Sequence, residues 1–421
     1  MGSDGGLLAP VWAGTRAEAI TSDAAWLRAM LEAEAALARA QARLELIPSE
    51  AAAAIDRTAA TLVLDPADLA RRSRQSANPV VPLVSDLRRA VPGAASSVHR
   101  GATSQDILDS AAMLVATRAI RAIVGDLSAI MRDLSELAER HRDTVMAART
   151  LGQQAVPTTF GLKAAGWLAG LMRARARLRE LRLPAQLGGA AGTLAAFAEH
   201  ADARGADPGT ALLLAEVFAE EIGLAAPPMP WHAERSPVTE LGAALTATAR
   251  ALAKPATDIV LMAQTEVGEV AESSAGSSSA MPQKRNPALS VLVRSAAFQV
   301  PAYAQVLGQV GEHERAAGAW QAEWLPLREA LRLTGGAAET AAELVAGLQV
   351  FPDRMRANTE LTGGRLLAER LAAHLDRKAL EEALSADGPL EGHAELLDPA
   401  AYLGAAPELV DRILATYREQ S

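Results

Sequence analysis

The chain has 421 residues, half of them apolar but only 3% aromatic, and a formal net charge of -9 at pH 7. The acidic balance argues against a general nucleic-acid surface and against docking on anionic lipid. The absence of cysteine excludes disulfides, thiolate zinc sites and cysteine nucleophiles. No apolar run reaches the roughly 18 residues that span a membrane, and the first ten residues lack the basic and apolar regions of a signal peptide. We therefore expect a cytoplasmic protein.

Apolar residues recur at three- and four-residue steps along most of the chain, which is typical of amphipathic helices. This spacing predicts helices at about 23–45, 104–140, 159–182, 209–223, 237–272, 288–322, 326–348 and 406–418. Runs with a period of two are nearly absent, so the expected fold class is all-α. Pro255 and Pro301 fall inside two of these helices and should kink them.

The helix expected at 104–140 is the longest. Its apolar face is formed by Ile107, Leu114, Ile120, Ile123, Leu127, Ile130, Leu134 and Leu137. At 1.5 Å per residue it would be roughly 55 Å long, too long to be covered by a small domain of its own. Such a helix usually belongs to a bundle, and we expect this bundle to be shared between subunits.

Small and polar residues gather in the segment 272–287, between two expected helices. Its serines and Gly276 can turn backbone N–H groups towards an anion, Lys284 adds a cation, and Asn286 adds a neutral amide. A carboxylate held there would gain negative charge when a proton leaves its α-carbon, and these groups are suited to stabilise it. On composition alone, a flexible linker with solvated charges explains the segment equally well.

The order of residues in SSSAMPQKRNP (277–287) favours the first interpretation. It resembles G-S-S-x-M-P-x-K-x-N-P, the signature of the aspartase/fumarase superfamily, with Ser277 in place of the glycine. The resemblance implies that Ser278 is the base that removes the proton next to the carboxylate. It also implies that Lys284 and Asn286 hold that carboxylate, and that the loop closes over bound substrate.

Two further stretches resemble the superfamily. VHRGATSQD (98–106) is similar to an H-x-G-A-T-S-x-D element, which implies substrate contacts for His99, Thr103 and Ser104. Without the resemblance, Thr103 or Ser104 is a helix N-cap and His99 a loop histidine. ARTLGQQAVPTT (148–159) is similar to an R-T-x-x-Q-x-A-x-P-x-T stretch, which implies substrate contacts for Thr150 and Gln153. Their alternative role is a hydrogen-bonded helix junction.

The branch of the superfamily that the chain resembles most is 3-carboxy-cis,cis-muconate cycloisomerase. Leu151 follows the R-T pair where many lyases of the superfamily carry histidine, and leucine cannot transfer a proton. The similarity also includes NPVVPLV (78–84), PWHAERSPVTELG (230–242) and EHERAAGAWQAEW (312–324). It implies substrate contacts for Asn78, Arg235 and Arg315, and for Gln283, which replaces a histidine usual in cycloisomerases. The alanines and glycine of 316–319 replace a phosphate-binding cluster, which argues against a nucleotide substrate.

The histidines show no metal-ligand spacing such as H-E-x-x-H, so we expect no metal and no other cofactor. His141, His200, His374 and His393 are expected at the surface, and His232 and His313 near the cleft.

The resemblance implies a long-helix bundle of the fumarase/aspartase type, assembled as a homotetramer with active sites shared between subunits. We expect an N-terminal helical domain (1–100), a central bundle with the catalytic loop (101–350) and a shortened C-terminal helical domain (351–421). The partner would be a small di- or tricarboxylate, with no nucleic acid and no membrane.

Three functional hypotheses remain open from the sequence. The leading one is a cycloisomerase that lactonises 3-carboxy-cis,cis-muconate through an aci-carboxylate intermediate. The second is a β-elimination lyase that releases fumarate from a substituted succinate, with nitrite or an amine as the leaving group. The third is a helical scaffold without activity, which the intact Ser278, Lys284 and Asn286 argue against.

Overall fold

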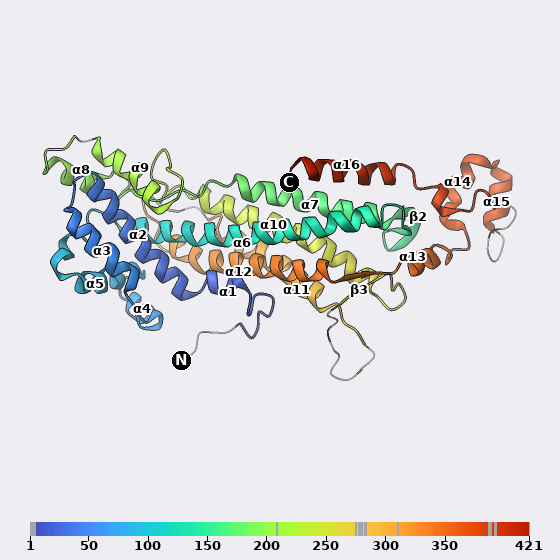
Figure 1. The fold of residues 1–421 in the computed structure, drawn as a ribbon, viewed down its shortest axis with the longest axis horizontal. Helices are drawn as coiled ribbons and strands as arrows, with labels where there is room; N and C mark the ends of the chain where they lie inside the picture. The colour runs from blue at the N-terminus through green and yellow to red at the C-terminus, as the bar shows by residue number, and fades with distance from the viewer. Residues whose placement is uncertain are drawn as a thin grey trace. The chain divides into compact units, whose positions relative to one another are not determined.

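The computed structural model describes residues 6–207, 209–273, 276, 281, 284–309, 311–385, 390 and 394–420. Most of these residues are helical, which confirms the expected fold class (Figure 1). The α-helices are α1 (Arg16–Ile20), α2 (Asp23–Arg43), α3 (Ser49–Thr61), α4 (Pro66–Ser73), α5 (Val80–Ala90), α6 (Ser104–Arg140), α7 (Phe160–Glu180), α8 (Ala195–Asp202), α9 (Thr210–Ile222), α10 (Ser236–Met262), α11 (Ala288–Val306), α12 (Ala319–Ala346), α13 (Pro352–Thr359), α14 (Ala368–His374), α15 (Arg377–Ser385) and α16 (Ala406–Glu419). Short 3₁₀ turns lie at η1 (Pro92–Ser97), η2 (Arg365–Leu367) and η3 (Pro399–Ala401).

The longest helix agrees with its prediction at both ends. α6 spans Ser104–Arg140, and its predicted apolar face is buried, with Ile123, Leu127, Ile130 and Leu134 all at 0% exposure. Leu114 is only half-buried. Helices α2, α7, α9 and α16 also lie within two residues of the expected bounds.

Three helix predictions were wrong at one end. The helix expected to reach residue 272 ends at Met262, where a turn through Gly268 (φ +62°) leads into a strand. The helix expected at 288–322 ends at Val306, because the next segment is interrupted by glycines, including Gly318 (φ +113°). A separate helix, α12, begins at Ala319 and carries Pro326 inside it.

The helix junction considered for 148–159 is a β-hairpin instead. Strand β1 (Val145–Thr150) pairs antiparallel with β2 (Gln153–Thr159), and Thr150 lies opposite Gln153. The two turn residues, Leu151 (φ +52°) and Gly152 (φ +79°), both have positive φ, which is the geometry of a type I′ turn. A second antiparallel pair joins β3 (Val270–Glu272) to β4 (Leu348–Val350).

The chain divides into two compact units, each made of three segments. Unit 1 contains 1–123, 178–246 and 298–336, and unit 2 contains 124–177, 247–297 and 337–421. The division into 1–100, 101–350 and 351–421 that we expect from the sequence stays a prediction. Across the described residues, no helix is both long and apolar enough to cross a membrane.

In unit 1, α2 packs against α3 and α9 (Figure 1). Leu37, Ile55 and Phe218, one from each of these helices, are fully buried. Small residues allow a close approach of the N-terminal segment to α12. A Cβ on Gly336 would lie 2.5 Å from the carbonyl oxygen of Val11. This contact explains a glycine in the middle of a helix, where glycine otherwise lowers helix stability.

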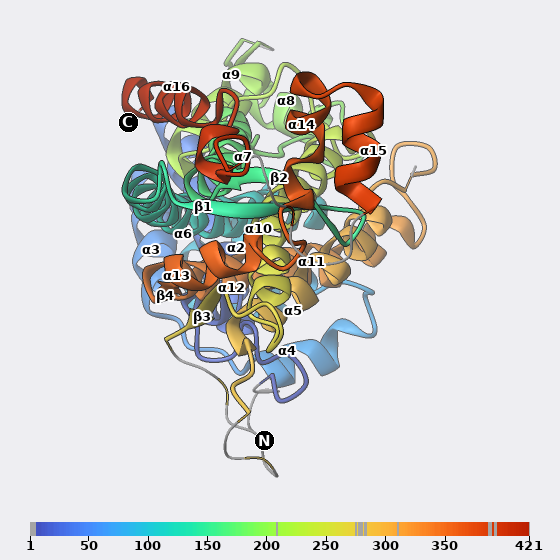
Figure 2. The ribbon, with the colours of Figure 1, turned by 90° about the vertical axis from the view of Figure 1, so that its right-hand side faces the viewer.

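In unit 2, helix α13 packs against β1, and the hairpin β1–β2 can be followed in Figure 2. The buried ring of Phe160 meets that of Trp167 edge to face, with centroids 5.8 Å apart. The Trp167 Nε1–H donates to Asp258 Oδ2 at 2.8 Å, which satisfies the polar edge of a buried indole.

Candidate active site

The residues that we predict to bind substrate fall in both units. Unit 1 holds Asn78, His99, Thr103, Ser104, Arg235 and Arg315, and unit 2 holds Thr150, Gln153, Lys284 and Asn286. The proposed base Ser278 and Gln283 lie outside the described residues.

In unit 1, a buried carboxylate fastens the N-terminus of α6 to the glycine-rich segment 186–192. Asp106 is 0% exposed. It accepts hydrogen bonds from the backbone N–H groups of Thr103 (2.9 Å), Gly188 (2.8 Å) and Gly189 (3.0 Å). An acid in the first turn of a helix is also favoured by the helix dipole. Asp106 thus fixes the segment that carries Thr103 against the glycine-rich segment.

The ionisation of Asp106 gives a pH-dependent prediction. Burial raises its pKa to about 6, against the lowering effect of the N–H donors. As the pH falls through about 6, Asp106 takes up a proton and its hydrogen bonds to the glycine-rich segment weaken. We expect kcat/KM to decline below pH 6, approaching about tenfold per pH unit. The contribution of this group to the free energy of unfolding changes in the opposite direction, because a raised carboxyl pKa favours the folded state as pH falls.

A pH profile of kcat/KM for the wild type and the Asp106→Asn variant checks this prediction. The variant should be less active and should lack the inflection near pH 6. An unchanged inflection in the variant would assign it to another group.

Arg315 joins the same region from the segment that precedes α12. Its Nη1 donates to Thr103 Oγ1 at 2.7 Å, and its Nη2 donates to the carbonyl oxygen of Ala190 at 2.9 Å. The Thr103 hydroxyl therefore accepts from Arg315. Ser104 is half-buried at the start of α6. Thr103, Ser104 and Arg315, three of the predicted substrate-binding residues, are thus brought together in the structure.

His99 lies close to this group in the sequence and is mostly buried. Its Nδ1 is 2.6 Å from Glu34 Oε1, and it adopts a left-handed backbone conformation, with φ +59°. Burial disfavours the charged imidazole, but Glu34 outweighs that effect and the pKa of His99 is raised. Asn78 instead caps α5, because its Oδ1 accepts from the backbone N–H groups of Val80 and Val81 at 3.1 and 3.3 Å.

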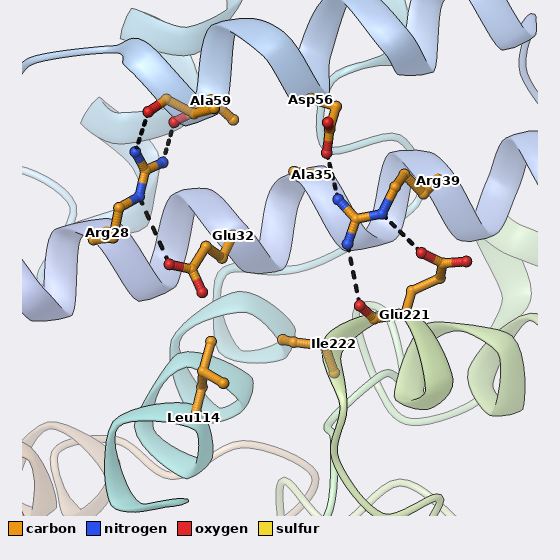
Figure 3. A pocket seen from close by; sticks show the side chains of 10 residues that line it. Arg28, Glu32, Ala35, Arg39, Asp56, Ala59, Leu114, Glu221 and Ile222 are labelled. Atoms are coloured by element: carbon orange, nitrogen blue, oxygen red, sulfur yellow. Dashed lines mark hydrogen bonds and ion pairs between the residues drawn. The ribbon is translucent and has the colours of Figure 1, made fainter. Parts of the chain in front are cut away.

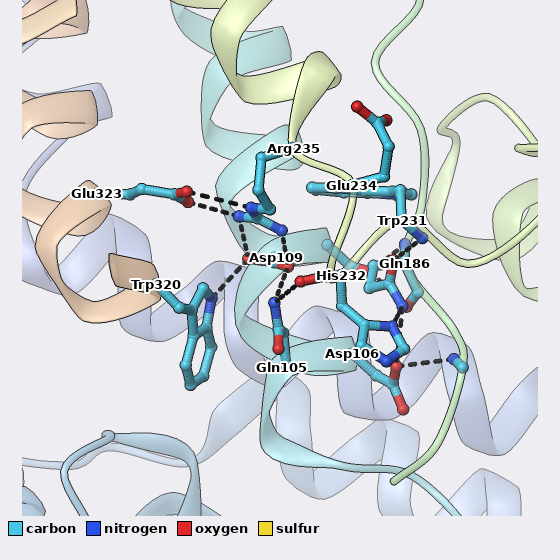
Figure 4. Close-up of polar contacts among 12 residues, drawn as sticks. Gln105, Asp106, Asp109, Gln186, Trp231, His232, Glu234, Arg235, Trp320 and Glu323 are labelled. Carbon is cyan, nitrogen blue, oxygen red and sulfur yellow. Dashed lines mark hydrogen bonds and ion pairs between the residues drawn. The ribbon is translucent and has the colours of Figure 1, made fainter. Parts of the chain in front are cut away.

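Arg235 lies at the centre of a buried ion cluster, shown in Figure 4. It bonds Asp109 at 2.6 and 3.2 Å and Glu323 at 2.6 and 3.2 Å. Asp109 also accepts from Trp320 Nε1 at 2.9 Å, and the guanidinium lies 4.8 Å from the centroid of the Trp231 ring. With four hydrogen bonds to two acids, Arg235 is placed to connect α6, α10 and α12 within unit 1. Substrate contact by Arg235 stays a prediction.

In unit 2, two sets of hydrogen bonds hold together described residues at the two ends of the segment 272–287. Gly276 and Asn286 exchange backbone hydrogen bonds of 2.9 and 3.0 Å. Glu272, which is 4% exposed, accepts from the backbone N–H groups of Leu289 (3.0 Å) and Ser290 (2.9 Å) at the start of α11. The carboxylate satisfies N–H groups that have no partner within the helix. Lys284 is exposed on this segment, and Asn286 is half-buried.

The hairpin tip with Thr150 and Gln153 is exposed, and Leu151 is fully exposed at 102%. The strand beside the tip is anchored, because Arg149 makes a two-pronged ion pair with Glu269 at 2.7 and 2.9 Å. Asn358 Nδ2 donates to the same carboxylate at 2.8 Å. The tip is thus exposed to solvent next to an anchored residue, Arg149.

A separate cavity of about 320 Å³ in unit 1 contains none of the predicted site residues (Figure 3). Its charged groups are already paired with one another. Arg39 donates to Glu221 Oε2 at 2.7 Å and also bonds Asp56. Leu114, the half-buried position of the predicted α6 face, lies against this cavity.

Sequence reasoning missed several residues that organise unit 1. Gln186 is 0% exposed and bonds Asp106 and His232, while Asp109 and Glu323 hold Arg235. One signal was present: Gln105, Asp106 and Asp109 lie on the same turns as buried Ile107 and Leu108. Charged residues on a buried helix face require a partner, but the sequence does not identify which one.

Comparisons with known proteins agree with the resemblance seen in the motifs. A family model described as Lyase matches residues 9–302. A nitrosuccinate lyase from Streptomyces davaonensis is 52% identical, with 97% of this chain and 94% of that protein covered. A 3-carboxy-cis,cis-muconate cycloisomerase from Pseudomonas aeruginosa is 40% identical, with 95% of this chain and 94% of that protein covered.

Solved structures give the same result. The 3-carboxy-cis,cis-muconate lactonizing enzyme from Pseudomonas putida has a TM-score of 0.88 and 36% identity, covering 98% of this chain and 99% of that chain. A fumarate lyase from Mesorhizobium has a TM-score of 0.83 and 34% identity, covering 95% of this chain and 97% of that chain. The chain belongs to the lyase family, within the aspartase/fumarase superfamily, and is an enzyme of its lyase and cycloisomerase group.

Proposed function

We propose that the protein is a β-elimination lyase that converts nitrosuccinate to fumarate and nitrite. The observation that carries this proposal is the 52% identity to a nitrosuccinate lyase over nearly the whole chain. The cycloisomerase relatives are 35–40% identical over similar or smaller shares of the chain. The proposal replaces the cycloisomerase, the leading hypothesis from sequence, with the second hypothesis.

The residues on the chain suit this reaction. Ser278 would remove a proton from the CH₂ group next to one carboxylate, which then carries the extra charge as an aci-carboxylate. Lys284 and Asn286 would stabilise that charge. The electron pair then forms the C=C bond as the C–N bond breaks, and nitrite leaves with the bonding electrons. Fumarate, nitrite and one proton are the products.

Nitrite leaves as a stable anion, so the reaction needs no general acid. This matches Leu151, which stands in the position where many lyases of the superfamily carry histidine and has no group that transfers protons. An amine leaving group would require such an acid. The residue at 151 therefore favours nitrite over an amine.

The group in unit 1 would bind the remaining anionic parts of the substrate. Arg315 is a permanent cation, and Thr103 and Ser104 carry hydroxyls at the N-terminus of α6, where the helix dipole favours an anion. Glu34 beside His99 raises the pKa of the imidazole against the effect of burial, which favours its charged form.

Lactonisation of 3-carboxy-cis,cis-muconate is the second candidate. The TM-score of 0.88 to the Pseudomonas putida lactonizing enzyme over nearly the full length of both chains favours it. Its reverse direction is also a β-elimination through an aci-carboxylate, with a carboxylate as the leaving group. The same base and anion-binding groups would serve both reactions.

The test of the proposal is incubation of purified protein with nitrosuccinate, followed by parallel assays of nitrite and fumarate. We expect the two products in a one-to-one ratio at a rate proportional to enzyme concentration. Nitrite without fumarate would indicate a different route of C–N cleavage. Neither product, from a folded protein, would overturn the proposal.

We also propose that the protein is a homotetramer whose active sites are shared between subunits. The exposed, anchored hairpin tip with Thr150 and Gln153 supports this, because polar candidate residues presented to solvent need a partner surface to form a site. Light scattering should give four times the chain mass of 43.9 kDa. A monomeric mass in the active protein would contradict both the tetramer and the shared site.

A further inference from the structure

His232 is a buried histidine of unit 1 to which the proposed reaction has so far assigned no role. It is 4% exposed and lies between Trp231 and the segment that leads to Arg235 (Figure 4). Its Nδ1 is 2.8 Å from Gln186 Nε2. Among the described residues, its other ring nitrogen, Nε2, has no hydrogen-bond partner.

The contacts of Gln186 determine which nitrogen of His232 carries the proton. The backbone N–H of Trp231, which can only donate, lies 2.8 Å from Gln186 Oε1, so that atom is the amide oxygen. The opposite atom is then the NH₂ group, and it contacts Asp106 Oδ1 (3.3 Å) and His232 Nδ1. Because this NH₂ group only donates, Nδ1 must accept. Neutral His232 therefore carries its proton on Nε2 and offers it as a donor.

The glycine-rich segment passes close to the Cε1 and Nε2 edge of His232, where its glycines leave room that side chains would fill. A Cβ on Gly188 would lie 2.7 Å from His232 Cε1, closer than side-chain atoms approach. A Cβ on Gly192 would lie 3.2 Å from Cε1 and 3.5 Å from Nε2. The same segment is held by Arg315 through Ala190 and by Asp106 through Gly188 and Gly189. His232 and the anion-binding pair Arg315 and Thr103 thus border the same segment.

We propose that the Nε2–H of His232 donates a hydrogen bond to an oxygen of the leaving group, and that Gln186 is the positioning residue that holds His232 in this tautomer. The inference rests on the proposed β-elimination. As the C–N bond breaks, negative charge develops on the nitro oxygens, so a donor fixed there stabilises the transition state more than the bound substrate.

His232 acts in this role as a neutral donor and transfers no proton. Burial and the positive charges of Arg315 and Arg235 lower the pKa of His232, against the opposing effect of Asp109. Asp106 faces it only through Gln186. A neutral donor suits a leaving group that departs as an anion, and it agrees with the absence of an acid at Leu151.

The test uses full-length protein labelled with ¹⁵N-histidine and solid-state NMR, with a His232→Gln sample to assign the signals. We expect His232 to be in the Nε2–H tautomer at pH 7.5. Its Nε2 resonance should shift when nitrite is added to the fumarate-bound protein. An Nδ1–H tautomer, or an Nε2 signal that nitrite leaves unchanged, would overturn the inference.

The second test of the role of His232 uses the variant Gln186→Glu. A carboxylate at 186 can only accept from His232 Nδ1, so the ring should switch to the Nδ1–H or doubly protonated form. We expect kcat with nitrosuccinate to fall by about 10²-fold, as for loss of one fixed donor, with a smaller change in KM. The matched control is Gln305→Glu, the same substitution at an exposed position of unit 1, which should leave kcat and the His232 spectrum unchanged. Wild-type kcat in a Gln186→Glu protein with the switched tautomer would overturn the proposed role.

Calorimetry with fumarate separates this inference from the proposed function. If fumarate does not bind the wild-type protein, the proposed function fails, and the contact to the leaving group fails with it. The second case is that fumarate binds and nitrosuccinate is turned over, but the Nε2 resonance of His232 does not shift when nitrite is added. Only the role of His232 is then overturned.

Discussion

Replacing Arg235 by methionine should lower the free energy of unfolding by about 3–5 kcal/mol, because the change leaves two buried carboxylates without a counter-charge. Arg235 is 8% exposed at its side chain, and Asp109 and Glu323 are each 4% exposed. Burial raises the pKa of Glu323 even beside Arg235, so its charge depends on that arginine. The measurement is urea denaturation followed by circular dichroism at one fixed protein concentration.

The pH dependence of the loss identifies its cause. Burial already raises the pKa of Glu323 above its unfolded value, and without Arg235 the main opposing effect is lost. The folded state then binds more protons than the unfolded state, so stability rises as pH falls. We expect the deficit of Arg235→Met to be larger at pH 8 than at pH 5.5. A deficit independent of pH would indicate lost packing rather than uncompensated charge.

Two variants serve as controls for this prediction. Arg142 makes a similar two-pronged contact with Asp411, at 2.7 and 2.9 Å, but at the surface, where such pairs contribute little. Arg142→Met should therefore change stability far less. The triple variant Arg235→Met, Asp109→Asn, Glu323→Gln removes all three charges and should recover part of the loss, because no buried charge is left unpaired.

The second large effect is expected at the proposed base. Ser278→Ala should lower kcat with nitrosuccinate by about 10²–10⁴-fold, the usual contribution of a positioned base. KM should change little, because the anion-binding groups remain. Steady-state kinetics with fumarate formation as the signal measures both parameters.

The neighbouring serine gives a matched control. Ser279→Ala makes the same substitution one position along the same segment and should retain most of kcat. Near-normal kcat in Ser278→Ala, or an equal loss in both variants, would remove the proton-transfer role from Ser278. Folding of each variant is checked by its unfolding midpoint, since this segment is held by hydrogen bonds of Glu272 and Asn286.

Much of the helical fold could be predicted from the sequence, because helices depend on local periodicity. α6 is an example: its apolar positions recur over 37 residues, and both ends were predicted correctly. The hairpin β1–β2 was missed because its strands have six and seven residues and its turn is Leu151–Gly152 rather than a favoured pair such as Asn-Gly. The break after Val306 was missed because the helix prediction continued through Gly308, Gly311 and Gly318.

From the sequence, site residues can be predicted where a residue belongs to a recognisable motif, as for Thr103, Ser104 and Lys284, whose roles stay predictions. They cannot be predicted where a role depends on partners distant in the sequence. Arg235 bonds Asp109, 126 positions away, and Glu323, 88 positions away. Gln186 and His232 lie 46 positions apart and acquire their roles only through Asp106 and the glycine-rich segment. Charge burial indicates that partners exist, but only the fold identifies them.

The measurement that tests the central claim most directly is kcat/KM for nitrosuccinate and for 3-carboxy-cis,cis-muconate with the same enzyme preparation. Formation of fumarate reports the first reaction, and loss of the diene absorbance reports the second. We predict efficient release of fumarate and nitrite, with a kcat/KM for nitrosuccinate at least about 10²-fold above that for the muconate, a difference in transition-state stabilisation of roughly 2.7 kcal/mol. The opposite order would contradict elimination of nitrite as the function and assign the protein to lactonisation.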